Sequence, residues 1–207
     1  MAELVSAVVL AGGRATRLGG TNKALLEIGG KRIIDRVLEA LRPLSDQIVM
    51  VGHLVEGLDF PEVEVVPDTH PGAGSMPALL TGLLVSRHEM ALVVGCDMPF
   101  LSTSLLRHIA ELSTGFDLAV PRIGPYLEAL HAAYHRSCLP VIEDYLRRRD
   151  LKIIDFYPSV RTREVPEIEL RAFDPDLRSF LNVNTPEDLE RARALARGVH
   201  EIDGQGG

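Results

Sequence analysis

The residues of this chain best suited to chemistry lie in one glycine-rich stretch near its amino end. An apolar run over residues 5–11, which includes Leu10 and Ala11, stops at the pair Gly12-Gly13. The cations that follow are Arg14, Arg17 and Lys23. Glycines let backbone N–H groups approach an anion, and successive amides in such a loop form a concavity that holds phosphate. We therefore predict a triphosphate-binding loop at the carboxyl end of a buried strand, in preference to a surface loop with three solvated cations.

The spacing within this loop excludes two widespread phosphate-binding motifs. Lys23 follows Asn22, so the pattern Gly-x-x-x-x-Gly-Lys-Ser/Thr is absent. The pattern Gly-x-Gly-x-x-Gly is absent as well, which argues against an NAD-dependent dehydrogenase.

Two acidic residues follow other predicted strands. Asp97 ends a continuous apolar run at Gly95-Cys96-Asp97-Met98-Pro99, and Mg²⁺ often takes only one or two protein carboxylates plus substrate phosphates. Asp97 is therefore the candidate metal ligand, although an Asp that starts a turn before Pro99 is also common. Asp68 can accept hydrogen bonds from a base or ribose, or can simply form a turn, and its residue type leaves both open. Cys96 is expected to be a packing residue.

Composition and charge narrow the class of protein. The chain has 207 residues and a formal net charge of −7, so we expect no general attraction to nucleic acid or to a membrane surface. Its two cysteines give neither a disulfide framework nor a zinc spacing. Without a secretory leader or a long apolar run, the expected location is the cytoplasm.

Strands and helices are predicted to alternate along the first half of the chain. The predicted strands are residues 5–10, 47–51, 63–66, 91–95 and 118–120, and the predicted helices are residues 33–41, 76–86 and a segment after Ser102. Such repeats favour an α/β fold with a mainly parallel sheet and helices on both faces. Ligands of such folds bind beyond the carboxyl ends of the strands.

The second half is less regular. Residues 128–134 are predicted as a strand of parallel or antiparallel direction, and residues 139–148 as a helix. Residues 161–165 and 180–183 are predicted as strands, and residues 151–157 are compatible with either type of element. Thr185-Pro186-Glu187-Asp188 starts a last helix that ends at Gly198. His131 and His135, four apart on a strand, are not expected to share a metal. We predict one domain over residues 1–200 and a disordered tail over residues 201–207.

The first stretch resembles the signature of a known family. Leu10-Ala11-Gly12-Gly13-x-x-x-Arg17-Leu18-Gly19-x-x-Lys23 is similar to that of the molybdenum cofactor guanylyltransferases, nucleotidyltransferases with a Rossmann-like three-layer fold. The element Asn182-Val183-Asn184-Thr185-Pro186-Glu187-Asp188-Leu189 is similar to their carboxyl-terminal motif. The resemblance spans the chain but is strong only at residues 8–31, 95–99 and 181–189.

This resemblance implies an activity and a set of roles. The activity is transfer of GMP from GTP to the terminal phosphate of molybdopterin or the molybdenum cofactor, with Mg²⁺ as cofactor and pyrophosphate as by-product. The implied catalytic residues are Arg17, Lys23 and Asp97, with Asp97 as the metal ligand. The implied nucleotide contacts are Leu10, Ala11, Gly12, Gly13, Lys23, Asp68 and Asp97, and Asn182 and Asn184 would support the metal or the acceptor. Transient contacts with other cofactor-biosynthesis or acceptor proteins are also implied.

Two departures from the family pattern keep other functions open. Residues 74–78 differ from the Gly-Pro-Leu-Ala-Gly that relatives usually show, and Val51 stands where many carry an Asn. A sister enzyme that uses CTP or another phosphorylated acceptor therefore remains an alternative, as does a non-catalytic nucleotide-binding relative. Intact Arg17, Lys23 and Asp97 argue against the latter.

Overall fold

The computed structural model describes residues 5–11, 23–52, 60–68 and 74–198. Residues 12–22 of the predicted phosphate loop, which include Gly12, Gly13, Arg14 and Arg17, lie outside the described residues, as does the predicted tail over residues 201–207.

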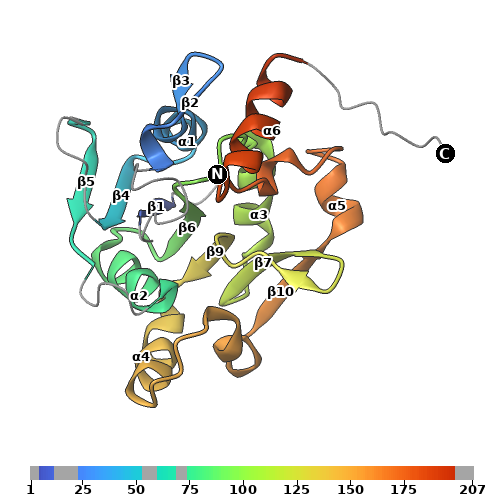
Figure 1. Cartoon of the computed structure of the whole chain (residues 1–207). Helices are drawn as coiled ribbons and strands as arrows, with labels where there is room; N and C mark the ends of the chain where they lie inside the picture. Colours follow the sequence, from blue (N-terminus) through green and yellow to red (C-terminus); the bar gives the residue numbers. More distant parts are fainter. Residues whose placement is uncertain (1–4, 12–22, 53–59, 69–73, 199–207) are drawn as a thin grey trace.

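A twisted, mostly parallel sheet runs through the described part of the molecule (Figure 1). Its strands are β1 (Ser6–Ala11), β4 (Gln47–Gly52), β5 (Val63–Val66), β6 (Met90–Gly95), β7 (Leu118–Ile123), β8 (Tyr126–Leu127), β9 (His131–His135) and β10 (Thr162–Pro166). They lie in the order β10-β7-β9-β6-β1-β4-β5, and β8 pairs with β7 at the side. Strand β9 is antiparallel to both of its neighbours, β6 and β7. The α/β fold class predicted from the sequence is confirmed.

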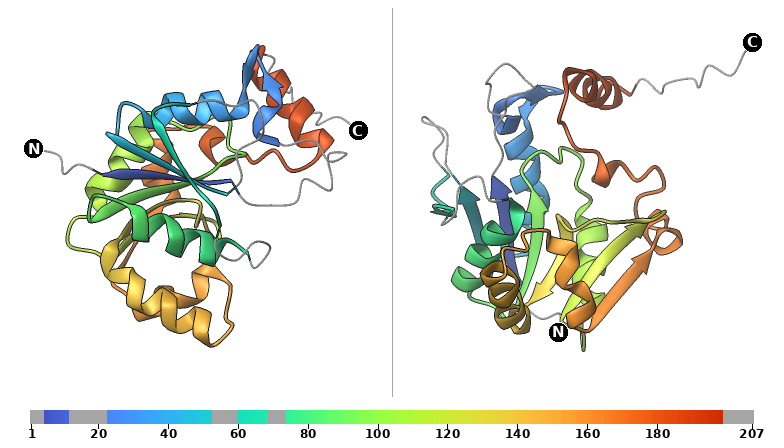
Figure 2. Two further views of the ribbon diagram at one scale, coloured as in Figure 1. Left: turned by 90° about the vertical axis from the view of Figure 1, so that its left-hand side faces the viewer. Right: turned by 60° about the horizontal axis from the view of Figure 1, so that its bottom comes forward.

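Helices cover both faces of this sheet, which gives three layers (Figure 2). One face carries α1 (Ile33–Leu41), α3 (Thr103–Leu112), α5 (Glu167–Arg171) and α6 (Pro186–Ala196). The other carries α2 (Ser75–Val85), α4 (Leu139–Arg147) and the 3₁₀ segment η4 (Ile153–Ser159). Successive side chains of a strand point to opposite faces. Accordingly, Ala7 and Val9 belong to the first core, and Val8 and Leu10 to the second. Because both faces are covered, the central strands are continuous apolar runs.

Most helix ends follow from their local sequence. The Ser102 hydroxyl accepts the backbone N–H of Leu105 at 3.3 Å and caps α3. Thr185 and Asp188 form a reciprocal capping box at the start of α6. Gly198, with φ +73°, follows the end of α6, as predicted. None of the helices among the described residues is long and apolar enough to cross a membrane.

The predicted strand over residues 180–183 was wrong. Arg178–Phe180 form the 3₁₀ segment η5 instead, and the preceding residue, Leu177, adopts a left-handed conformation with φ 54°. The Val183 N–H donates to the carbonyl of Asp97 at 2.9 Å rather than to a neighbouring strand. The apolar side chains of this run pack on the first core, beside α3 and α6. A short, mainly apolar segment such as this one is equally compatible with a strand and with an irregular segment buried under helices.

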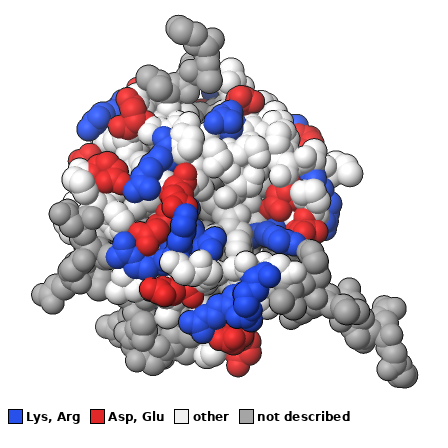
Figure 3. Space-filling model, turned by 90° about the horizontal axis from the view of Figure 1, so that it is seen from above, with Lys and Arg blue, Asp and Glu red and all other residues white. Residues whose placement is uncertain are grey.

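A small hairpin next to α1 was not predicted. It joins β2 (Glu27–Ile28) to β3 (Lys31–Arg32) through Gly29 and Gly30, which have φ of 59° and 76°. Both values lie in the left-handed region, which glycine adopts with little steric strain because it has no Cβ. On the surface over this hairpin, α1 and α6, basic and acidic side chains stand side by side (Figure 3). They include the pairs Lys31–Glu39, Arg32–Asp35 and Arg193–Glu190.

Candidate active site

Three side chains distant in the sequence meet at the carboxyl edge of the sheet. Strands β1 and β6 are parallel neighbours, and just beyond them the Cys96 N–H donates to the carbonyl of Leu10 at 3.2 Å. Lys23 opens the 3₁₀ segment η2 (Lys23–Leu25). Its Nζ lies 3.9 Å from Oδ2 of Asp97 and donates to Oδ1 of Asn184 at 2.6 Å. The structure thus brings together the predicted loop cation, the predicted metal ligand and one of the two predicted asparagines.

The segment before α6 is tied to the rest of this site by its backbone. The Val183 N–H donates to the carbonyl of Asp97, and Oδ2 of Asp188 accepts the backbone N–H groups of Asn184 at 2.9 Å and Thr185 at 2.8 Å. The side chain of Asn184 is therefore held at the cluster, whereas Nδ2 of Asn182 donates to the carbonyl of Phe180 at 3.3 Å. Because residues 180–183 are not a strand, the alternation that would place Asn182 and Asn184 on one face of a sheet does not apply. Both still line one pocket.

The space for the Asp97 carboxylate depends on a residue that sequence reasoning missed. A Cβ placed on Gly95 would lie 2.8 Å from Oδ1 of Asp97, closer than real Cβ contacts allow. A glycine two residues before a candidate acid is the only sequence signal for this contact. The contact itself depends on the turn of the chain at the end of β6, which brings the Asp97 carboxylate back toward Gly95.

The electrostatics of the cluster suit a charged ligand. Burial raises the pKa of Asp97, while Lys23 and a backbone hydrogen bond oppose that rise. The side chains of Lys23 and Asp97 remain 21% and 22% exposed, so a ligand can reach both. Burial, aided by the charge of Asp97, raises the pKa of Cys96 to about 12. Cys96 is therefore a neutral thiol at neutral pH and packs against the first core, as expected.

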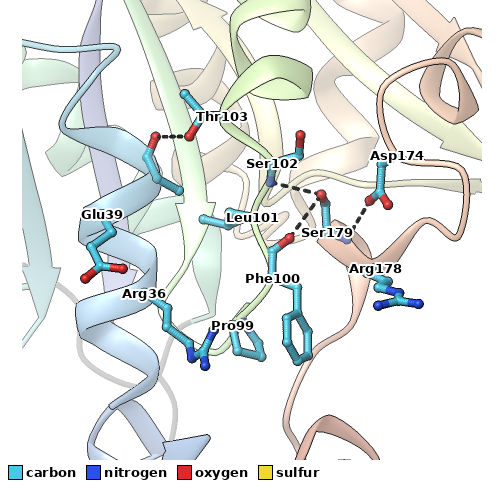
Figure 4. A pocket seen from close by; sticks show the side chains of 11 residues that line it. Arg36, Glu39, Pro99, Phe100, Leu101, Ser102, Thr103, Asp174, Arg178 and Ser179 are labelled. Carbon is cyan, nitrogen blue, oxygen red and sulfur yellow. Dashed lines mark hydrogen bonds between the residues drawn. The ribbon is translucent and has the colours of Figure 1, made fainter. Parts of the chain in front are cut away.

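A network behind the site fixes the chain that follows Asp97 (Figure 4). The Thr103 hydroxyl donates to the carbonyl of Ala40 on α1 at 3.0 Å. The buried Ser179 hydroxyl accepts the backbone N–H of Ser102 at 3.0 Å and donates to the carbonyl of Phe100 at 3.3 Å. The backbone N–H of Ser179 donates in turn to Asp174 at 2.7 Å. This network joins α1, the segment after β6 and η5. It therefore ties the segment that follows Asp97 to the segment that leads to Asn184.

The remaining predicted residues that the structure describes, Leu10, Ala11 and Asp68, lie along the same edge. Leu10 is buried and Ala11 half-buried, and they pair with Val51 and Gly52 of β4. Val51 is fully buried in the second core and offers no polar side chain. Asp68 follows β5, two strands away from β1. The divergent residues 74–78 still turn into a helix, since Gly74 has φ +92° and α2 begins at Ser75.

The side chains at the end of β6 could supply only part of the oxygen ligands of a magnesium ion. Among the described residues, no group of three or more His, Cys, Asp or Glu side chains could hold a metal by itself. Asp97 offers an accessible carboxylate at the end of β6, and the amide oxygen of Asn184 is nearby. This arrangement suits a hard cation that takes most of its oxygen ligands from substrate phosphates and water.

The fold and this site define a class: an α/β protein built to hold a phosphorylated ligand at the carboxyl ends of its central strands. Comparison with known proteins is more specific. The family model described as "MobA-like NTP transferase domain" matches residues 7–160, and the chain belongs to this family.

Individual relatives agree with the family match. A probable molybdenum cofactor guanylyltransferase of Pelotomaculum thermopropionicum is 42% identical, over 91% of this chain and 92% of that protein. A molybdenum cofactor guanylyltransferase of Desulfosudis oleivorans is 37% identical, over 94% and 97%. The crystal structure of molybdopterin-guanine dinucleotide biosynthesis protein A from Archaeoglobus fulgidus superimposes with a TM-score of 0.80 at 29% identity, covering 94% of this chain and 100% of that one. The family resemblance predicted from the sequence is confirmed.

Proposed function

We propose that this protein transfers GMP from GTP to the terminal phosphate of molybdopterin or the molybdenum cofactor, with release of pyrophosphate. The observation that carries this proposal is the meeting of Lys23, Asp97 and Asn184 at the carboxyl edge of β1 and β6, in a chain of this family. The names of its relatives indicate the nucleotide and the acceptor.

The reaction is a displacement at phosphorus. An oxygen of the acceptor's phosphate monoester forms a bond to the α-phosphorus of GTP, the bond from that phosphorus to the bridging oxygen of the β-phosphate breaks, and pyrophosphate leaves. The attacking oxygen is already ionised near neutral pH, so no side chain has to remove a proton. The described residues of the site therefore have to provide position and positive charge.

Each residue of the cluster has a role in this scheme. The Lys23 ammonium would neutralise charge on the triphosphate, together with Arg17, and Asn184 holds that ammonium in place through its 2.6 Å hydrogen bond. Asp97 would hold Mg²⁺, which when bound offsets the negative charge of the phosphates. Backbone groups of Leu10, Ala11, Gly12 and Gly13 would contact the nucleotide, and Asp68 would contact its base or ribose. Asn182 would support the acceptor from the adjoining pocket.

The proposal is tested by measuring pyrophosphate release with molybdopterin and each of GTP, CTP and ATP, and by calorimetric titration of the same nucleotides. We expect GTP to bind and react in preference to the others. A preference for CTP would identify a sister enzyme, and nucleotide binding without pyrophosphate release would identify a non-catalytic relative.

The metal role is tested with Asp97→Asn, which keeps the size of the side chain but removes its charge. We expect turnover to fall by about 100-fold or more, the typical loss when a group that stabilises transition-state charge is removed. Glu89→Gln is the control, because Glu89 is 70% exposed and precedes β6 at the opposite edge of the sheet. Near wild-type turnover of Asp97→Asn with an unchanged magnesium requirement would refute the assignment.

A further inference from the structure

A pocket of about 670 Å³ adjoins the site on the side of β9 and β7. Asn184 lines this pocket and also accepts the hydrogen bond of Lys23, so the pocket lies next to the Lys23–Asp97 cluster. Its walls come from the end of β7, the connection from β8 to β9, η5 and α6, and its lining includes Ile123, Glu128, Phe180, Leu181, Asn182 and Asn184. The lining is mixed: apolar side chains stand beside charged and amide side chains, which include Asp176, Arg178, Asp188 and Arg191. Such a pocket can hold a small molecule that carries both a ring and charged groups.

Glu128 is fixed in this pocket by its backbone. Because β9 runs antiparallel to β6, the start of β9 meets the end of β6, and the Gly95 N–H donates to the carbonyl of Leu130 at 3.3 Å. The backbone N–H of Glu128 donates to the carbonyl of Pro121 at 3.0 Å on the other side. Glu128 therefore lies at the same sheet edge as Asp97.

The carboxylate of Glu128 differs from the other acids that line the pocket. It is half-buried, and among the described residues it has no hydrogen bond or ion pair. Asp176 pairs with Arg178 at 2.7 Å, and Asp188 caps α6. Partial burial of an unpaired carboxylate costs free energy, so such groups are found where a ligand supplies the missing donors. Burial alone raises the pKa of Glu128, in agreement with the lack of a cationic partner.

The proposed reaction brings two molecules that present suitable donors. Guanine and pterin rings share a 2-amino-4-oxopyrimidine edge, in which an amino group and a ring N–H can donate in parallel to the two oxygens of a carboxylate. The two rings are distinguished by position. Asp68 follows β5, whereas Glu128 lies by β9 and β7, on the other side of β1 in the sheet. A nucleotide with its base toward Asp68 leaves the Glu128 pocket to the acceptor.

We propose that Glu128 is a specificity-determining residue for the acceptor: its carboxylate accepts hydrogen bonds from the amino-pyrimidine edge of the pterin ring, while the acceptor's phosphate lies by Asn184. This inference rests on the proposed function. Phe180 and Leu181 supply apolar surface beside the ring, and Glu128 sets its orientation.

Steady-state kinetics of Glu128→Gln test this assignment. Replacement of one carboxylate oxygen by an NH₂ group removes the charge and places a hydrogen-bond donor opposite an N–H donor of the pterin ring. We expect the KM for molybdopterin to rise about 10- to 100-fold, the usual worth of hydrogen bonds to a charged group, with the KM for GTP and kcat unchanged. Glu89→Gln is the matched control. A rise in the KM for GTP alone would assign Glu128 to guanine, and no change in either KM would show that it contacts neither ring; both results overturn the inference.

A second test needs no variant. Free pterin and lumazine, which carries an oxygen in place of the 2-amino group, are compared as inhibitors of the wild-type enzyme. We expect pterin to compete with molybdopterin at least about 10-fold more strongly than lumazine, and equal inhibition would overturn the inference. If the wild-type protein transfers no GMP to molybdopterin, the proposed function itself fails. If it transfers GMP but does not discriminate these rings, only the role of Glu128 fails.

Discussion

At the scale of single residues, the position of Asp97 depends on the absence of a side chain at Gly95. The carboxylate folds back beside the end of β6, where a Cβ on residue 95 would stand 2.8 Å from its Oδ1. In this position it faces Lys23 Nζ at 3.9 Å. The backbone of Gly95 does not have a left-handed φ, so an alanine is compatible with the main chain and only the carboxylate has to move.

Gly95→Ala is therefore expected to impair turnover without unfolding the protein. Displacement of a catalytic group by about 1 Å can cost on the order of 100-fold in rate, and we expect a loss of that size in GMP transfer. The melting temperature should stay close to that of the wild type, because the free end of the Asp97 side chain can yield. Turnover assays and thermal melts of the same preparation provide the measurement. Wild-type turnover would show that the carboxylate does not need its observed position.

At the scale of elements, the packing of α2 on the sheet also depends on a glycine. A Cβ on Gly82 would lie 2.5 Å from Cγ1 of Val8 on β1 and 3.4 Å from Cγ2 of Val51 on β4. Helix α2 thus approaches the two central strands more closely than a residue with a side chain would permit. It also begins at the divergent residues 74–78, so its contact with β1 helps to set the distance of that segment from the sheet.

Gly82→Ala is expected to destabilise the protein while leaving the site residues in place. Overpacking a core typically costs about 1–3 kcal/mol, which exceeds the roughly 1 kcal/mol gained by replacing glycine with alanine in a helix. We expect a net loss on the order of 1 kcal/mol in urea unfolding. Leu84→Ala on the same helix is the control, because Leu84 is 51% exposed and its truncation should change stability by less than about 0.5 kcal/mol. Equal stability of both variants and the wild type would contradict the close contact.

Local patterns predicted the elements that are long or strongly periodic. The apolar runs of β1, β4 and β6 and the helical spacing in α1 gave the correct type, with ends displaced by a residue at most. Residues 180–183 were misassigned because their three apolar residues, Phe180, Leu181 and Val183, pack equally well in a strand or under a helix. The pair Gly29-Gly30 carries the usual signal of a tight hairpin, but the two-residue strands beside it are too short to show alternation.

The site was predictable to the extent that it follows from strand direction. Lys23 and Asp97 were expected at one edge because both follow parallel central strands, and the structure places them there. The contact of Gly95 with the Asp97 carboxylate and the place of Glu128 depend on a turn geometry and on the register of β9 against β6. Both are set by packing between distant segments, which no local pattern reveals.

At the scale of the whole molecule, one buried imidazole ties stability to pH. His131 starts β9, is fully buried, and lies 4.5 Å from the ring of Phe180 in η5. Among the described residues, neither of its ring nitrogens has a hydrogen-bond partner. Burial lowers its pKa from 6.5 to about 3, although the charge of Asp174 opposes this shift. The native protein therefore keeps His131 neutral in a range where the unfolded chain protonates it.

Stability is consequently expected to fall on acidification from about pH 7.5 to about pH 5. Because the native pKa is lower than the unfolded one, the unfolded state binds the extra proton, so the stabilisation present above pH 6.5 is lost progressively down to about pH 3. At about pH 5 the loss from this residue is about 2 kcal/mol, from roughly 1.5 pH units at about 1.4 kcal/mol each.

His131→Leu removes this titration and both unpaired nitrogens. In urea unfolding, the wild type should therefore lose about 2 kcal/mol more than His131→Leu between the two pH values. The variant also cancels the contributions of all other groups that titrate alike in both proteins, including the raised pKa values of Asp97 and Glu128, which act in the opposite direction. Parallel losses in the two proteins would mean that the buried imidazole accepts a proton in the native state.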